Sequence, residues 1–146
     1  MGLVNSFGVS RSALQAERLR MDVVSNNIAN MNSTRSENGG PYQRQAVVFR
    51  ADGDTPSFQS LLAQRSGGTT SGGVQIDGVI SDSRPPRRVY EPNNPDADAE
   101  GYVLYPDIDI SSEMTDMISA QRSYQANVTA LNAIKGMAQK ALDIGR

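Results

Sequence analysis

The stretch SNNIANMNSTR, from Ser25 to Arg35, places four asparagines within eleven residues. Asparagine tolerates left-handed backbone, and its amide can bond the last carbonyl groups of a helix, which have no partner within the helix. We therefore predict that a helix ends in this stretch and that the asparagines hold the turn that follows. The residues of this turn motif are Asn26, Asn27, Ile28, Ala29 and Asn30.

The residues before this stretch have the pattern of a long helix. Neither glycine nor proline occurs between Gly8 and Gly39, and apolar residues recur at intervals of seven. A second set of positions, three residues further along each repeat, is only half apolar. We expect the helix to begin near Asn5 or Ser6. The apolar seam consists of Phe7, Leu14, Met21 and Ile28, with Val24 from the second set.

The C-terminal part of the chain repeats this pattern. No proline follows Pro106, and the residues from Met114 onward form a seam in steps of three and four, which predicts a second long helix. We expect Ser111 and Ser112 to cap its first turn and Gly145 to end it. The seam includes Met114, Met117, Tyr124, Val128, Leu131 and Leu142.

Short β-prone segments lie between the two helices, separated by glycine and proline. The expected strands are residues 42–49, 73–81, 87–90 and 101–110. Residues 66–73 are expected to form a flexible loop, and residues 55–65 fit either a loop or a helical turn.

The predicted fold class is therefore α+β, with long terminal helices that pair as an antiparallel coiled-coil-like unit around a small β-rich middle segment. An ordinary α+β domain with both helices on a sheet fits the periodicity equally well. The segments are residues 1–33, the N-terminal helix and asparagine-rich turn; residues 34–110, the β-rich middle; and residues 111–146, the C-terminal helix that packs with the first.

The composition excludes several classes of function. Histidine and cysteine are both absent, which removes the commonest general base, thiolate nucleophiles, disulfides and ordinary zinc ligands. No catalytic or cofactor motif occurs, so we predict neither an enzyme nor a cofactor. No apolar run approaches the roughly 18 residues that span a bilayer, and the N-terminus lacks the features of a secretory signal. Scattered arginines and a pI of about 5.1 disfavour nucleic-acid binding.

Charge is unevenly distributed along the chain. Residues 1–50 carry a net charge of +3, residues 51–89 are neutral, and residues 90–146 carry −5. Opposite charges on the two parts favour their pairing within one chain or between chains.

A calcium-binding module is the alternative that has a sequence motif. Residues 96–107, DADAEGYVLYPD, match the twelve-residue EF-hand loop at its first, third and sixth positions. Glu100 and Asp107 differ from the residues usual at positions five and twelve. Two prolines upstream of the loop, and Pro106 immediately before its last position, disfavour the flanking helices that the loop requires. A solvated acidic turn is the favoured interpretation of this segment.

The motif Asn-Ile-Ala-Asn at residues 27–30, closing an N-terminal helix, resembles the signature of bacterial flagellar rod, hook and hook-associated axial proteins. Three further segments resemble the basal-body rod proteins of this family over nearly the whole chain. They are GGPYQRQAVVF (39–49), VYEPNNPDADAEGYVLYPDIDI (89–110) and EMTDMISAQRSYQANVTALNAIKGMAQKAL (113–142).

This resemblance implies a structural subunit of the proximal rod. Such a subunit polymerises into a tubular drive shaft that transmits torque and encloses the export channel. The implied location is the rod within the periplasm, reached through the flagellar type III export apparatus without a cleaved signal peptide or direct membrane insertion. The implied partners are further copies of the chain, the rod proteins FlgB, FlgF and FlgG, and the ring–rod junction protein FliE. The two helix seams would then form the assembly interface.

Overall fold

The computed structural model describes residues 2–36, 39–51 and 72–145. Its elements, in chain order, are α1 (Gly2–Ala29), β1 (Gln45–Ala51), β2 (Val74–Ser81), β3 (Arg87–Tyr90), β4 (Tyr102–Tyr105) and α3 (Ile110–Ile144). The helical turn considered for residues 55–65 lies outside the described residues, as does the loop expected near residues 66–73 except for its last two residues.

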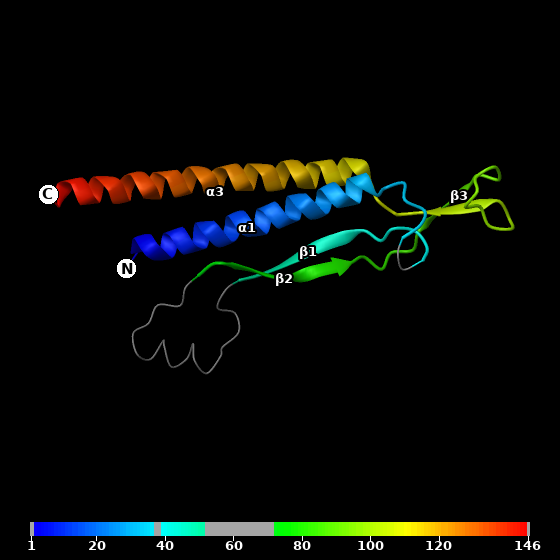
Figure 1. Cartoon of the computed structure of the whole chain (residues 1–146), viewed down its shortest axis with the longest axis horizontal. Helices are drawn as coiled ribbons and strands as arrows, with labels where there is room; N and C mark the ends of the chain where they lie inside the picture. Colours follow the sequence, from blue (N-terminus) through cyan, green and yellow to red (C-terminus); the bar gives the residue numbers. More distant parts are fainter. Residues whose placement is uncertain (1, 37–38, 52–71, 146) are drawn as a thin grey trace, which may run out of the picture.

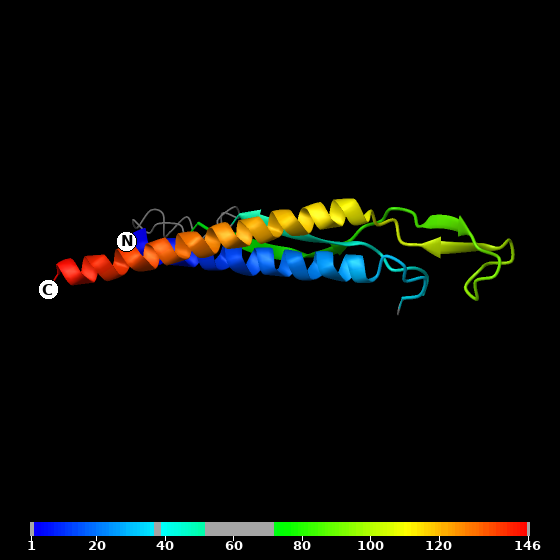
Figure 2. The ribbon, with the colours of Figure 1, turned by 90° about the horizontal axis from the view of Figure 1, so that it is seen from above.

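The two long helices lie side by side and run in opposite directions (Figure 1). Helix α1 is the middle layer, because it packs against α3 on one side and against the β1–β2 sheet on the other. The β3–β4 hairpin extends past the end of the helix pair at which α1 ends and α3 begins (Figures 1 and 2). The predicted α+β fold with paired terminal helices is confirmed, and the two helices do not lie together on one sheet.

Helix α1 suits a middle layer because its buried residues are small or β-branched. Ala16, Val23 and Val24 are buried along it, and Ala120 of α3 is fully buried. Small side chains allow the helix axes to approach closely. The helix begins at Gly2, earlier than predicted. Within the described part of the chain, neither long helix is apolar enough over its length to cross a membrane.

Asp109 caps α3, and the prediction of Ser111 and Ser112 was wrong. The Asp109 carboxylate accepts hydrogen bonds from the backbone N–H groups of Ser111 (3.2 Å) and Ser112 (3.3 Å). These amides have no partner within the helix, and an aspartate bonds them with a full negative charge at the positive end of the helix dipole. The helix ends at Ile144, with the expected Gly145 as its C-cap.

The strands form two separate antiparallel pairs. In the first sheet, β1 and β2 pair from Gln45 opposite Ser81 to Ala51 opposite Val74, with an irregularity between Val48 and Phe49. In the second, β3 pairs with β4 over four residues, and β4 is shorter than the predicted strand 101–110. Pro106 explains its end, because proline has no N–H to donate to a ladder.

Among the residues that the structure describes, left-handed backbone occurs at glycine and not at asparagine. The described residues with positive φ are Gly39, Gly40 and Gly101, so the left-handed conformation expected for the asparagine-rich turn is wrong. At Gly101 (φ 85°) a Cβ atom would also lie only 2.9 Å from a ring carbon of Tyr90. A glycine is therefore required where the β3–β4 hairpin turns back on itself.

Mutation of Asp109 tests its assignment as the N-cap of α3. Asp109→Ala should lower the free energy of unfolding by about 1 kcal/mol, because two helix amides lose their acceptor. Urea unfolding monitored by circular dichroism would measure the change. Ser112→Ala is the matched control, because the Ser112 hydroxyl has no hydrogen-bond partner among the described residues. Equal stability of the Asp109→Ala variant and the unmodified chain would contradict this assignment.

Candidate functional site

The side chain of Asn27 is fully buried at the contact between α1, β1 and α3. Its amide nitrogen donates to the backbone carbonyl of Gln45 (2.9 Å) and to Oε2 of Glu113 (3.0 Å). Its amide oxygen accepts from the backbone N–H of Gln45 (2.9 Å) and from the hydroxyl of Tyr42 (3.0 Å). A primary amide offers two donors and two acceptor sites, so its hydrogen-bonding capacity is used in full.

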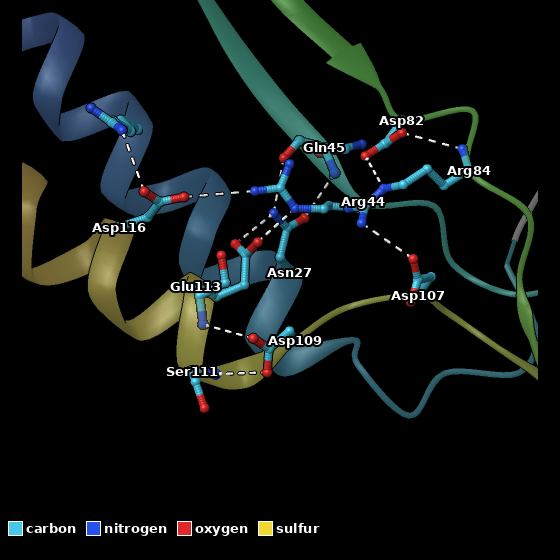
Figure 3. Close-up of polar contacts among 12 residues, drawn as sticks. Asn27, Arg44, Gln45, Asp82, Arg84, Asp107, Asp109, Ser111, Glu113 and Asp116 are labelled. Carbon is cyan, nitrogen blue, oxygen red and sulfur yellow. Dashed lines mark hydrogen bonds and ion pairs between the residues drawn. The ribbon is translucent and has the colours of Figure 1, made fainter.

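Glu113 brings a carboxylate into the same buried region, with only 1% of its surface exposed. Its Oε1 atom accepts a hydrogen bond from Nε of Arg44 at 2.6 Å, which pairs the two charges (Figure 3). Asp116, one turn further along α3, pairs with Arg44 (3.7 Å) and with Arg20 of α1 (3.6 Å). A buried carboxylate without such a partner would cost several kcal/mol.

These residues form one connected group, which we call the Asn27 junction. It joins the end of α1, the start of α3 and the chain entering β1, segments that are distant in sequence. Because each buried polar group has a partner, the three elements are held in one relative position. The residues of the junction are Asn27, Tyr42, Arg44, Gln45 and Glu113.

A second charged cluster lies beside the junction, close to Arg44 (Figure 3). Arg84 donates to Asp82 (2.8 Å) and to Asp107 (3.2 Å), which links the end of β2 to the segment before α3. The hydrogen bond from Arg84 lowers the pKa of Asp82 below its ordinary value. This exposed cluster extends the polar connection between the sheet and α3.

The other asparagines of the turn motif act locally. The amide of Asn30 donates to the backbone carbonyl of Asn26 (2.9 Å), and its oxygen accepts from the hydroxyl of Ser33 (3.1 Å). The same carbonyl also accepts the backbone N–H of Asn30 (3.0 Å), so the Asn30 amide adds a second hydrogen bond to a carbonyl in the last turn of α1. Asn26 and Ala29 are exposed. The motif thus has one inward residue, Asn27, and one capping residue, Asn30.

The predicted seam residues occupy three different environments. Val24 is buried and lines a small pocket together with residues of β1, such as Ala46 and Val47. Met21, Met117 and Tyr124 line an open groove between α1 and α3, with polar residues such as Arg18 and Gln121 beside them. Phe7, Leu14, Ile28, Val128 and Leu131 are half-buried, whereas Met114 (52%) and Leu142 (74%) are exposed.

An exposed apolar stripe on α3 extends this groove. Ile110, Met114 and Ile118 are 41%, 52% and 48% exposed, and their spacing of four places them on one side of the helix. Met117 follows Met114 by three residues, so the stripe adjoins the groove. Sequence reasoning found Met114 but missed the two isoleucines, although the spacing of four was the signal that would have identified them.

The carboxylates of the proposed calcium loop bond within the protein instead. Asp96 accepts from Thr34 (2.6 Å) and pairs with Arg35. Asp98 accepts from the backbone N–H groups of Glu100 (2.9 Å) and Tyr102 (2.8 Å), as the acidic turn of a hairpin does. Residues 102–105 form a strand, and the described residues contain no group of three or more acidic side chains arranged to hold a metal ion.

Comparison with known proteins places these two helices in a defined class. Residues 7–35 match the family described as "Flagella basal body rod protein", and residues 99–144 match "Flagellar basal body rod FlgEFG protein C-terminal". These segments contain most of α1, its turn motif and all of α3. The Asn27 junction connects the end of α1 with the start of α3. The class is therefore that of flagellar basal-body rod proteins.

Full-length relatives define the family more closely. The chain is 49% identical over 152 residues to flagellar basal-body rod protein FlgC of Bacillus subtilis, and 40% identical over 146 residues to FlgC of Salmonella typhimurium, with 100% of both chains covered in each case. FlgC of Borreliella burgdorferi is 39% identical over 149 residues, covering 99% of this chain and 98% of the relative. The chain belongs to the FlgC family of flagellar basal-body rod proteins.

Removal of the Asn27 side chain tests the junction. Asn27→Ala should lower the free energy of unfolding by about 2 to 4 kcal/mol, because buried groups of Gln45, Tyr42 and Glu113 lose their partner. The neighbouring Asn26→Ala should stay within about 0.5 kcal/mol, because Asn26 is exposed. Thermal and urea unfolding of both variants would measure this difference, and equal losses would contradict a special role for the Asn27 amide.

The junction also predicts a dependence of stability on alkaline pH. Burial, and then the negative charge of Glu113, raise the pKa of Tyr42 above its ordinary value of 10.0. As the pH rises, the Tyr42 hydroxyl therefore loses its proton in the unfolded chain before it does so in the folded chain. The contribution of Tyr42 to the free energy of unfolding is complete below about pH 10 and is lost as the pH rises through the pKa of Tyr42 in the folded chain. Tyr42→Phe should reduce the fall in unfolding free energy between about pH 9 and 11. The unfolding free energy would be measured by urea unfolding at each pH. An equally steep fall with pH in Tyr42→Phe and in the unmodified chain would contradict the burial of the neutral Tyr42 phenol.

Proposed function

We propose that this chain is a structural subunit of the flagellar basal-body rod, where it assembles with other rod components. The observation that carries this proposal is full-length similarity to FlgC proteins, including the segments of both terminal helices. The function is mechanical: the chain transmits force and carries out no reaction. The absence of histidine and cysteine from the sequence agrees with such a role.

The assembly interface in this proposal is the apolar surface that one chain leaves uncovered. It comprises the α1–α3 groove around Met21, Met117 and Tyr124, together with the stripe that contains Met114. Covering each large side chain contributes about 1.5 to 3 kcal/mol, so several such contacts per subunit would hold neighbouring subunits firmly. The half-buried residues Phe7, Leu14, Ile28, Val128 and Leu131, and the exposed Leu142, add their uncovered parts to this surface. Val24, which is buried beside β1, supports this surface from inside the subunit.

The helix pair suits the transmission of torque. Helix α1 packs between α3 and the β1–β2 sheet, and the Asn27 junction fixes the end where these elements meet. A subunit that resists internal sliding passes a lateral load on to its neighbours. Many such subunits around a central channel would form the tubular drive shaft of the proximal rod.

Membership of the family supports the finer assignments that we propose. We assign the rod within the periplasm as the location, with delivery through the flagellar type III export apparatus. The assigned neighbours are copies of this chain, FlgB, FlgF, FlgG and FliE. Residues 1–33 and 111–146 would serve as the packing segments of the subunit, and residues 34–110 as its β-rich middle segment.

An aspartate within the exposed stripe tests the proposed interface. Met114→Asp should reduce incorporation into basal bodies at least tenfold, because burying an unpaired carboxylate between subunits costs more than 1.4 kcal/mol, which corresponds to about tenfold. Met114 is exposed in the single chain, so the variant should still fold. Immunoblots of purified basal bodies and swimming assays would follow the effect in cells that lack the unmodified chain.

Ser119→Asp is the matched control, because it places the same charge at an exposed position on another side of α3. It should incorporate normally. Normal incorporation of Met114→Asp, with circular dichroism showing both variants folded, would contradict the interface. Basal bodies that form rods in cells lacking the chain altogether would contradict the function.

A further inference from the structure

The β3–β4 hairpin stands apart from the rest of the molecule, and we call residues 87–105 the hairpin unit. It projects past the helix pair, and in the described residues neither β3 nor β4 packs against a helix or against the β1–β2 sheet (Figures 1 and 2). The orientation of the unit is therefore set by the segments that join it to the chain and by side chains that reach across from it.

The hairpin unit is held together from inside. The carboxylate of Glu91 accepts hydrogen bonds from the hydroxyl of Tyr105 (3.0 Å) and from the amide of Asn94 (3.0 Å). The rings of Tyr90 and Tyr102 pack edge to face, with 5.3 Å between their centres. Together with the four-residue ladder between β3 and β4, these contacts give the unit a fixed internal structure.

The polar contacts between the hairpin unit and the rest of the chain are made by Asp96. Its carboxylate accepts a hydrogen bond from the hydroxyl of Thr34 (2.6 Å) and pairs with Arg35, two residues of the segment that follows α1. Among the residues that the structure describes, no other residue of the unit forms a hydrogen bond or an ion pair outside it. The side chains of Arg35 and Asp96 are 77% and 21% exposed, so water reaches this contact.

Apolar packing next to Asp96 is incomplete. A cleft of about 230 Å³ lies between the hairpin unit and residues 34–41, lined by Pro41 on one side and by Val103 and Leu104 on the other. Val103 is buried, but Leu104 is 40% exposed. Because the apolar contact here is small, the bonds of Asp96 carry a large share of the attachment of the unit.

Two short linkers join the hairpin unit to the rest of the chain. Residues 82–86 follow β2, and residues 106–109 precede α3. Each linker contains proline, which has no N–H to donate to a strand ladder. Arg84 of the first linker donates to Asp107 of the second at 3.2 Å, so the two linkers are held together at the base of the unit. Short irregular segments of this kind are where hinges occur in proteins.

We propose that Asp96 is a latch that fixes the orientation of the hairpin unit, and that the unit pivots about its two linkers when this latch opens. Opening breaks the bonds from Asp96 to Thr34 and Arg35 and leaves the bonds inside the unit intact. Water replaces the lost hydrogen bonds of this partly exposed contact, so opening costs less than unfolding of the chain. The closed and open states differ in the direction in which the unit points.

This inference does not depend on the proposed rod function, because every contact that it uses lies within one chain. In the proposed rod, the open state would let the hairpin unit adjust to neighbouring subunits while the Asn27 junction keeps the helix pair fixed.

The distance between two spin labels tests the latch in the full chain. Cysteine is absent, so Ala99→Cys in the hairpin turn and Ser119→Cys on α3 create two exposed labelling sites without other changes. Double electron–electron resonance should give one main distance in this chain. Adding Asp96→Ala should broaden the distribution and raise the ratio of open to closed molecules about tenfold, because two polar contacts are lost. An unchanged distribution would overturn the proposal.

Variants on the other side of the latch test the same contact from outside the hairpin unit. Thr34→Val combined with Arg35→Ala should reproduce the broadening seen with Asp96→Ala. Arg87→Ala is the matched control and should leave the distribution unchanged, because the exposed Arg87 side chain has no polar partner among the described residues. No broadening in the combined variant, or equal broadening in the control, would overturn the assignment of the latch.

A second pair of labels distinguishes pivoting from local unfolding. Arg87→Cys and Ala99→Cys both lie in the hairpin unit and report its internal structure. Asp96→Ala should leave this distance unchanged, because the Asp96 carboxylate forms none of the hydrogen bonds inside the unit. Broadening of this internal distance would show that the unit unfolds, and would overturn the pivot.

Discussion

The buried amide of Asn27 imposes the constraint on which the rest of the structure depends. An amide removed from water must find partners for its donors and acceptors, or the fold loses stability. Asn27 finds them on the backbone of Gln45 and on the side chains of Tyr42 and Glu113. Sliding of β1 or α3 by one residue would break several of these bonds at once, so the junction sets the register of three elements.

The charged pair beside Asn27 adds to this constraint. A buried glutamate is tolerated only with a cation and further hydrogen bonds, which Arg44 and Asn27 supply to Glu113. Such a pair contributes little net stability compared with apolar residues of the same volume, but it strongly disfavours arrangements in which either partner is missing. We attribute to it the specificity of the joint between the terminal helices, a property that a subunit under mechanical load needs.

Only a few apolar side chains are buried within one chain, and this limited burial is the feature of the fold that bears on assembly. The buried apolar residues of the described chain are Ala16, Val23, Val24, Val103 and Ala120, all of them small or β-branched. The larger side chains, such as those of Met114, Ile118 and Met137, lie mostly on the outside. In the proposed rod, neighbouring subunits would complete this burial along the sides of the helices. The polar junction orients the parts of one subunit, and contacts between subunits would supply the remaining apolar burial.

The sequence by itself determined the two helices, because apolar spacing and the absence of proline within them act locally. The resemblance of its turn motif and other segments to known rod proteins indicated the class of protein. It did not identify the partners of Asn27, since Gln45 and Glu113 are 18 and 86 residues away and neither spacing nor composition predicts such a contact. Nor did it distinguish Val24, which is buried, from Met114, which is exposed, because both satisfy the same apolar pattern. Tertiary structure decided these points: which side of a helix is covered depends on the position of its neighbours, and that position is set by long-range polar bonds.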